Sequence, residues 1–224
     1  MAHLEIEIKS LLGSKSAADA LLAKMQTIDS ACVSTSNNTQ LNHYFEGGEI
    51  TALFEATKHF FTPEQLQKFE KIVAQGTDFS IRTRQRDSEV LLVIKASIDE
   101  GTSANTISRL EFEEAVPVTL GALDEIFLGL GYTYQAKWSR RRDEYLYKGI
   151  TVCFDKNAGY GYLAEFEKVV PNGSDVATTR AELDIVMAEL GVSELSQERL
   201  ARMFAYYNAN WADYYGTDKT FTIE

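Results

Sequence analysis

The stretch from Leu4 to Lys9 alternates strictly between apolar and charged residues, and this alternation constrains the fold more than any other feature of the chain. Successive side chains of a β-strand point to opposite faces, so the pattern predicts a strand with one apolar and one charged face. Glu5, Glu7 and Lys9 share the charged face. Two carboxylates at this spacing lie roughly 6.5–7 Å apart and repel each other unless solvent, a metal ion or a cationic partner separates them.

The same alternation recurs in later segments, often with two charges of the same sign on one face. The charges that share a face are Arg82, Arg84 and Arg86, then Arg109, Glu111 and Glu113, then Arg140 and Arg142, and then Glu165 and Glu167. Lys95 and Asp155 are further charges in segments of this kind. The opposite faces carry Ile6, Ile8, Leu110, Phe112 and Phe166. We therefore expect the apolar faces to point outward against helices and the charged faces to point inward.

Hydrophobic periodicity and turn residues predict eight strands, mostly joined by hairpins, with helices in the connections and after the last strand. The strands are expected at 4–9, 40–45, 79–86, 89–97, 107–116, 132–147, 150–155 and 162–170. The helices are expected after Ser14 or Ser16 up to Ile28, in an insertion at 49–76 with an N-cap at Thr62, at 123–131, and at 175–190 and 196–215. Eight antiparallel strands are enough to close a barrel that holds one small ligand. We predict an α+β fold in which a closed eight-stranded antiparallel β-barrel with a charged interior is surrounded by helices. Residues 1–224 would form one domain, with the strands at about 4–170 and the C-terminal helices at about 174–215.

The net charge of −11 argues against nucleic acid or an anionic membrane as the main partner. The longest aliphatic run, Leu91–Ile94, is far too short to cross a bilayer, and the N-terminal residues lack the apolar core of a signal peptide. We therefore expect a cytoplasmic protein whose Cys32 and Cys153 are free thiols. His43 is expected at the surface more readily than in the barrel, because a lone histidine carries little information.

An interior with this many charges has to be neutralised by mutual pairing, water, metal ions or a ligand. Carboxylate oxygens suit Mg²⁺ or Mn²⁺, whereas guanidinium and ammonium groups suit phosphate oxygens. A polyphosphate with bound metal ions satisfies both sets. The alternative is that the charged residues form solvated faces of an open sheet.

The order of these residues resembles the CYTH superfamily, the triphosphate tunnel metalloenzymes. The motif Glu5-Ile-Glu7-Ile-Lys9 is similar to the N-terminal E-x-E-x-K signature of that family, and the resemblance extends over residues 4–170. The later elements of the resemblance are Arg82-x-Arg84, Lys95, Glu111-x-Glu113, a basic pair at Arg140-x-Arg142, Asp155, Gly161 and Glu165-x-Glu167. It implies an eight-stranded tunnel that binds a triphosphate with divalent metal. Known members include class IV adenylate cyclases, thiamine triphosphatases and inorganic triphosphatases. Lys137 or Arg141 could replace one residue of the basic pair.

The resemblance also implies roles for the charged residues. The phosphate chain would be bound by Lys9, Arg82, Arg84, Lys95, Arg140 and Arg142. The metal, Mg²⁺ or Mn²⁺, would be bound by Glu5, Glu7, Asp155, Glu165 and Glu167. Glu111 and Glu113 would hold a second metal or orient the attacking water, and Lys9 would join them as a catalytic residue. The leading hypothesis is metal-dependent hydrolysis of a small-molecule triphosphate, by a chain that could be a homodimer. The alternatives are a class IV-type adenylate cyclase and a polyphosphate-binding module without catalysis.

Overall fold

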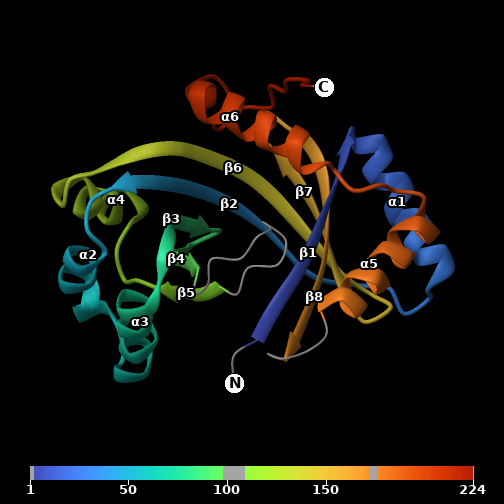
Figure 1. The fold of residues 1–224 in the computed structure, drawn as a ribbon. Helices are drawn as coiled ribbons and strands as arrows, with labels where there is room; N and C mark the ends of the chain where they lie inside the picture. The colour runs from blue at the N-terminus through green and yellow to red at the C-terminus, as the bar shows by residue number, and fades with distance from the viewer. Residues whose placement is uncertain (1–2, 98–108, 172–175, 224) are drawn as a thin grey trace. The chain divides into compact units, whose positions relative to one another are not determined.

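The computed structural model describes residues 3–97, 109–171 and 176–223, and it leaves out the side chains of residues 3–5, 109 and 171. The described residues form an α+β fold with an eight-stranded antiparallel sheet and six α-helices (Figure 1). The strands are β1 (His3–Gly13), β2 (Val33–Gly47), β3 (Thr77–Arg86), β4 (Glu89–Ser97), β5 (Arg109–Ala115), β6 (Tyr132–Tyr147), β7 (Ile150–Asn157) and β8 (Gly161–Pro171). The helices are α1 (Lys15–Ile28), α2 (Ile50–Thr57), α3 (Pro63–Gln75), α4 (Leu120–Gly129), α5 (Val176–Leu190) and α6 (Gln197–Tyr214), with a 3₁₀ turn at Lys58–Phe60.

The sheet is not closed into a barrel within the described residues, so the predicted closure is wrong. The strand order is β1-β8-β7-β6-β2-β3-β4-β5, which makes β1 and β5 the edge strands. The period-two pattern fixes which side chains share a face, but it carries no information about whether the first and last strands of the order pair with each other. The segment between the strands predicted at 89–97 and 107–116 lies outside the described residues, as does the start of the second of these strands.

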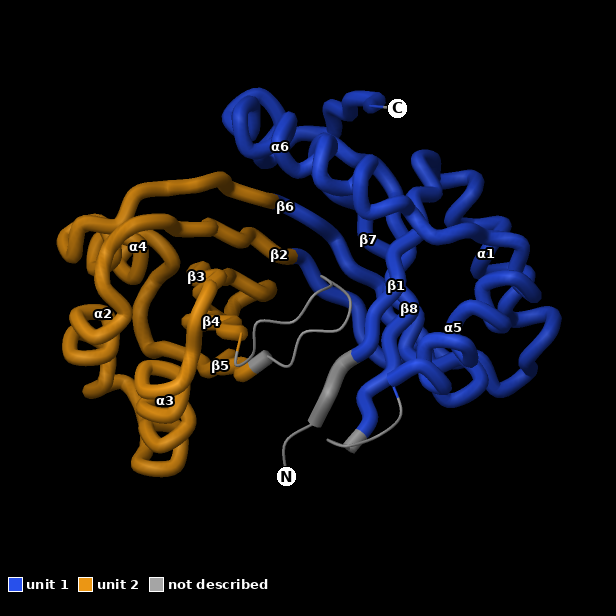
Figure 2. The backbone as a smooth tube through the Cα atoms, viewed as in Figure 1, with its two compact units in different colours: residues 1–39, 139–224 blue, residues 40–138 orange. Residues whose placement is uncertain are grey.

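The chain divides into two compact units, drawn in different colours in Figure 2. Unit 1 consists of residues 1–39 and 139–224, and unit 2 of residues 40–138. Strands β2 and β6 each contribute residues to both units. The organisation as one domain over residues 1–224 stays a prediction.

Unit 1 has its own hydrophobic core on one face of β1, β8 and β7. Ile6 and Ile8 of β1 and Phe166 of β8 are buried in it. Helices α1 and α5 cover this face, and Met25 and Leu183 are fully buried there. The apolar face of β1 therefore packs against helices, as its alternation predicts, and Glu7 and Lys9 belong to the opposite face.

Unit 2 has a second core, in which β3, β4 and β5 pack against helices α3 and α4. Ile94 of β4 and Phe112 of β5 are buried beside Phe69 and Ile72 of α3. Helix α3 begins at the predicted position, because Thr62 and Gln65 form a complete capping box. Arg82 and Arg84 of β3 have the parity opposite to that of Ile81, which is a member of this core.

Two other local predictions have different outcomes. Lys148 and Gly149 both have positive φ angles in the β6–β7 hairpin, which is the geometry that a two-residue turn requires. By contrast, β2 begins at Val33, well before the strand predicted at 40–45, so the polar residues 34–38 belong to it. Strand pairing overrides the weak β propensity of serine and asparagine there.

Cys32 and Cys153 are free thiols, as predicted. No helix in the described part of the chain is both long and apolar enough to cross a membrane.

Candidate metal and phosphate-binding site

The register of β1 and β8 brings charged side chains of unit 1 together from residues that are far apart in the sequence. Lys9 lies directly opposite Glu165, and Glu7 lies directly opposite Glu167. The first pair combines opposite charges. The second places two carboxylates face to face, an arrangement that destabilises a sheet unless positive charge compensates it.

Glu7, Glu165 and Glu167 form the group of carboxylates best suited to a metal ion among the described residues. Each offers one oxygen, and these oxygens lie within 4.8 Å of one another. Three oxygen ligands at such distances fit a hard divalent cation such as Mg²⁺ or Mn²⁺, with water completing the coordination. Glu5 lies on β1 with the same parity as Glu7, but its side chain is outside the described residues.

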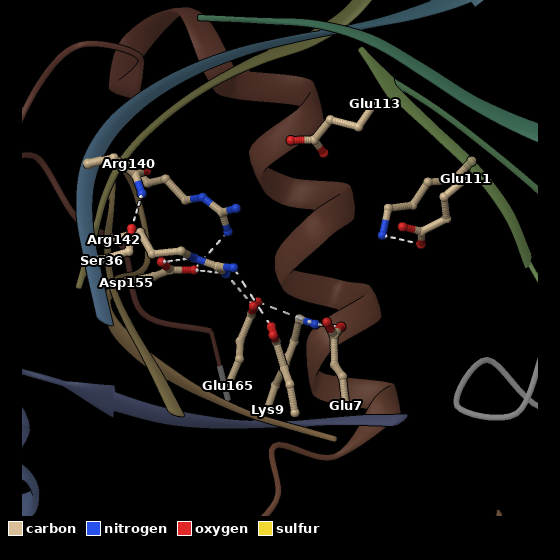
Figure 3. Close-up of polar contacts among 12 residues, drawn as sticks. Glu7, Lys9, Ser36, Glu111, Glu113, Arg140, Arg142, Asp155 and Glu165 are labelled. Carbon is tan, nitrogen blue, oxygen red and sulfur yellow. Dashed lines mark hydrogen bonds and ion pairs between the residues drawn. The ribbon is translucent and has the colours of Figure 1, made fainter. Parts of the chain in front are cut away.

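A cationic cluster lies beside these carboxylates in unit 1, as Figure 3 shows for Arg140, Arg142, Asp155 and Glu165. Asp155, only 1 % exposed, accepts hydrogen bonds from both arginines. Arg142 donates to its two oxygens at 2.8 and 2.7 Å, and Arg140 donates to one of them at 2.7 Å. Arg142 also contacts Glu165 and lies 3.7 Å from Glu167. Both oxygens of Asp155 are thus occupied by arginines, and its predicted role as a metal ligand stays a prediction.

Lys9 lies among the same carboxylates. Its ammonium group contacts Glu7 and lies 3.4 Å from Glu165. Burial raises the pKa of Glu165, but the charges of Lys9 and Arg142 outweigh this effect and hold the pKa below its ordinary value. Burial lowers the pKa of Arg142, but its hydrogen bond to Asp155 and the charge of Glu165 raise the pKa above the ordinary value. Glu165 is therefore a carboxylate and Arg142 a cation at neutral pH.

Unit 2 carries the second set of predicted residues on one face of β3, β4 and β5. One nitrogen of Arg84 donates to both carboxylate oxygens of Glu113 at 3.0 Å, and its Nε donates to Asn42 at 2.7 Å. Lys95 lies opposite Glu111 in the register and forms an ion pair with it at 2.6 Å. Two of the predicted phosphate-binding residues of this unit, Arg84 and Lys95, are thus paired with the predicted water-orienting residues Glu113 and Glu111.

Arg82 differs from the other cations of unit 2. It donates to the hydroxyl of Tyr44 at 2.5 Å, and its guanidinium lies 5.1 Å from the centre of that ring. Its Nε is buried and has no hydrogen-bond partner among the described residues. A buried donor without an acceptor is costly, so this atom is suited to an incoming acceptor such as a phosphate oxygen.

The sequence profile described as the CYTH domain matches residues 63–201, which is more than half of the chain. The chain belongs to the CYTH family. The matched range contains every predicted site residue except Glu5, Glu7 and Lys9, whose assignment depends on the register of β1 and on the E-x-E-x-K resemblance. The family includes triphosphatases and proteins proposed to be adenylate cyclases.

Solved structures share the CYTH fold of this chain at low sequence identity. A conserved protein from Pyrococcus furiosus has a TM-score of 0.58 and 19 % identity, over 87 % of this chain and 93 % of its own. The PH1819 protein of Pyrococcus horikoshii has a TM-score of 0.59 and 20 % identity, over 91 % of this chain and 99 % of its own. A protein from Vibrio parahaemolyticus proposed to be an adenylate cyclase has a TM-score of 0.56 and 15 % identity, over 90 % and 99 %. No curated protein matches the chain.

The candidates for the basic pair of the CYTH pattern differ in the contacts that their side chains make. The side chain of Arg141 is 63 % exposed and contacts Asp143, away from Asp155. Lys137, in unit 2, lies over the ring of Tyr134 at 3.9 Å. Of these candidates, Arg140 and Arg142 are the two whose side chains bind Asp155.

Sequence reasoning missed a buried polar network in unit 2 and misplaced one of its members. His43 is 5 % exposed, so the prediction of a surface histidine is wrong. Its Nδ1 lies 2.6 Å from Asp124, which also accepts from Thr83 at 2.6 Å and from the hydroxyl of Tyr134 at 2.8 Å. Burial raises the pKa of Asp124, but the hydrogen bonds from His43, Thr83 and Tyr134 together hold the pKa below its ordinary value. Asn42 and Tyr44 were missed as well: their parity places them on one face of β2, but only the β2–β3 register shows that they lie opposite Arg84 and Arg82.

Proposed function

We propose that this CYTH protein hydrolyses a triphosphate, inorganic or organic, with Mg²⁺ or Mn²⁺ held by Glu7, Glu165 and Glu167. The observation that supports this most strongly is the convergence of the three carboxylates on strands whose register sets two of them face to face. A network of ion pairs that only stabilises the fold does not need two carboxylates facing each other, whereas a divalent cation bound between them compensates their repulsion directly. When bound, the cation supplies positive charge that stabilises the transferred phosphoryl group.

Lys9, Arg140 and Arg142 are proposed to bind phosphate oxygens. Arg142 keeps its charge at all relevant pH values, because Asp155 and Glu165 raise its pKa. Asp155 fixes the guanidinium through two hydrogen bonds, so that the arginine is oriented before the substrate binds. Phosphoryl transfer depends mainly on such positioning and on charge stabilisation.

In unit 2 we propose phosphate binding for Arg82, Arg84 and Lys95. Arg82 is supported best, because its buried Nε lacks an acceptor among the described residues. Glu111 and Glu113 are proposed to hold a second metal or to orient the attacking water. Each of them forms an ion pair with a cation of the same face, Glu113 with Arg84 and Glu111 with Lys95, and its carboxylate oxygens can also accept hydrogen bonds from water.

The test is hydrolysis of tripolyphosphate and ATP with Mg²⁺ or Mn²⁺, with products identified by phosphorus NMR. Glu7→Gln keeps the shape of the side chain and removes a charged ligand, and we expect turnover to fall about 100-fold or more. The matched control is Glu182→Gln, because Glu182 forms an exposed ion pair with Lys168 on the helix-covered side of unit 1. Turnover by Glu7→Gln at the wild-type rate would contradict the proposed metal site.

A second candidate function is cyclisation of ATP, since one structural neighbour is proposed to be an adenylate cyclase. The same NMR experiment distinguishes the two reactions, because cyclisation yields pyrophosphate and cyclic AMP, whereas hydrolysis yields orthophosphate. Metal-dependent binding of tripolyphosphate without any product would indicate a polyphosphate-binding module instead.

A further inference from the structure

The buried carboxylate of Asp124 has no role in the reaction proposed above. It lies on α4 beside the fully buried Phe127 and is itself only 4 % exposed. Burial raises its pKa, and hydrogen bonds from His43, Thr83 and Tyr134 bring the pKa below its ordinary value. An apolar side chain would fill the same place in the core without this desolvation cost. Packing alone therefore does not account for a carboxylate at this position.

Two of the residues that contact Asp124 form a cross-strand pair in the sheet. His43 on β2 lies directly opposite Thr83 on β3. The Nδ1 atom of His43 lies 2.6 Å from one oxygen of Asp124, and the hydroxyl of Thr83 donates to the other oxygen at 2.6 Å. One carboxylate on α4 thus contacts two neighbouring strands at a single position of their ladder.

This cross-strand pair lies between the two arginines of unit 2 that are proposed to bind phosphate. One step along the ladder, Tyr44 lies opposite Arg82 and accepts its hydrogen bond at 2.5 Å. One step in the other direction, Asn42 lies opposite Arg84 and accepts a hydrogen bond from its Nε at 2.7 Å. Because successive side chains alternate between faces, Asp124 holds the strands from one side and the arginines project from the other.

The apolar residues of β2 specify its register against β3 only weakly. On the helix-covered side, the paired segment 40–45 carries Leu41 and Phe45, with His43 between them. A shift of β2 by two residues would keep both apolar side chains on this side, but it would place other residues opposite the arginines. A polar pair that reaches a buried carboxylate in one register alone selects that register, as a buried polar residue does in coiled coils.

We propose that Asp124, His43 and Thr83 are positioning residues that fix β2 against β3, so that Arg82 and Arg84 are oriented before the phosphate chain binds. This inference rests on the proposed function, because that function assigns phosphate binding to the two arginines. Prior orientation lowers the cost of forming the contacts between guanidinium groups and phosphate. Loss of the network weakens binding of the substrate and of the transition state equally, so KM rises and kcat is kept.

The test removes one hydroxyl of the network and then restores it. Thr83→Val keeps the shape of the side chain, and we expect the KM for tripolyphosphate with Mg²⁺ to rise about fivefold while kcat changes less than about twofold. Thr83→Ser keeps the hydroxyl, and its KM should lie within about twofold of the wild-type value. A wild-type KM in Thr83→Val, or a KM in Thr83→Ser as high as that of Thr83→Val, would overturn the proposal.

Thr57→Val is the matched control. Thr57 is a fully buried threonine of unit 2 whose hydroxyl donates at 2.8 Å to the carbonyl oxygen of Leu53, within α2 and not to the sheet. Its KM should stay within about twofold of the wild-type value. A KM raised as much as in Thr83→Val would show a general effect of lost buried hydroxyls and overturn the assignment. If circular dichroism shows that Thr83→Val does not fold, Thr83→Ala takes its place, because alanine leaves room for water beside the carboxylate.

A second measurement separates the positioning role from the proposed function. If the wild type hydrolyses neither tripolyphosphate nor ATP, the function is wrong, and the position of Arg84 is then measured without turnover. Its Nε–H donates to Asn42, so the proton–nitrogen NMR signal of this group, assigned with Arg84→Lys, reports on that contact. A signal that shifts or disappears in Thr83→Val and is kept in Thr57→Val would still support the positioning role. The same signal in the wild type and both variants would overturn it.

Discussion

Replacing Asp155 by asparagine tests whether this residue is needed by the fold itself or only by a bound metal ion. The carboxylate is 1 % exposed and accepts three hydrogen bonds, one from Arg140 and two from Arg142. Asparagine has nearly the same shape, but it is uncharged, and its amide group would face guanidinium donors. The substitution therefore removes the charge that compensates two partly buried cations.

The expected loss of stability follows from this geometry. Removing one partner of a buried ion pair costs about 3–5 kcal/mol, because the other charge is left uncompensated. Arg142 keeps its contact with Glu165, and the two arginine side chains are 11 % and 18 % exposed, so some solvation remains. We expect a loss at the lower end, about 3 kcal/mol. With a urea slope of about 2–3 kcal/mol/M, the unfolding midpoint should fall by roughly 1 M.

The measurement is urea unfolding followed by circular dichroism in a buffer that contains a chelator, so that metal binding contributes nothing. Asp143→Asn is the matched control, because Asp143 lies on β6, the strand that carries the two arginines, is half-buried and pairs with exposed Arg141 at 3.3 Å. Its effect should stay within about 0.5 kcal/mol. If Asp155→Asn unfolds at the same urea concentration as this control, the carboxylate does not stabilise the arginine pair and our reasoning is refuted.

Three further predictions concern pH, the buried network and backbone space. Because the pKa of Glu165 is lower in the folded chain than its ordinary value of 4.5, this group contributes stability above about pH 4.5 that is lost as the pH falls further. The melting temperature of Glu165→Gln should therefore decline less than that of the wild type between pH 5 and pH 3, and parallel curves would exclude this linkage. Asp124→Asn should destabilise the fold by about 2–4 kcal/mol, since the anionic acceptor of three donors, two of them buried, is lost, and a change below about 0.5 kcal/mol in urea unfolding would show that the network is dispensable. Gly48→Ala should cost about 1–3 kcal/mol, because φ is +65° and the new Cβ meets the ring of Tyr132, whereas Gly121→Ala in open space on α4 should be neutral or stabilising in the same thermal assay.

Local patterns predicted the strands and their faces well, because each is determined by neighbouring residues. The alternation at Ile6, Glu7, Ile8 and Lys9 was enough to assign an apolar face that packs on helices and a charged face opposite to it. Turn residues located the β6–β7 hairpin in the same way. Closure of the sheet depends instead on whether β1 and β5 pair, and no local pattern reports on a contact between distant strands.

Prediction of the site from the sequence is limited in the same way, because contacts between distant strands cannot be derived from local patterns. The parity of the strands identified Lys9 and Glu165 as charged-face residues, but only the register shows that they lie opposite each other. The partners of the cations could not be derived either, because the contact of Arg82 with Tyr44 and of Arg84 with Asn42 depends on the pairing of β2 with β3. His43 was misplaced because its partner Asp124 belongs to a helix distant in sequence.

The pairing of β1 with β8 has a consequence during synthesis of the chain. At about 5–20 residues per second, a ribosome needs roughly 8–30 s to extend the chain from Lys9 to Glu165. Unit 2 is a continuous segment that is synthesised before β8, whereas β1 has to wait for β8, its neighbour in the described sheet. For roughly 8–30 s the nascent chain therefore exposes a β-strand whose backbone N–H and C=O groups lack their partner strand. Such a strand is a natural target for chaperones that bind emerging polypeptides.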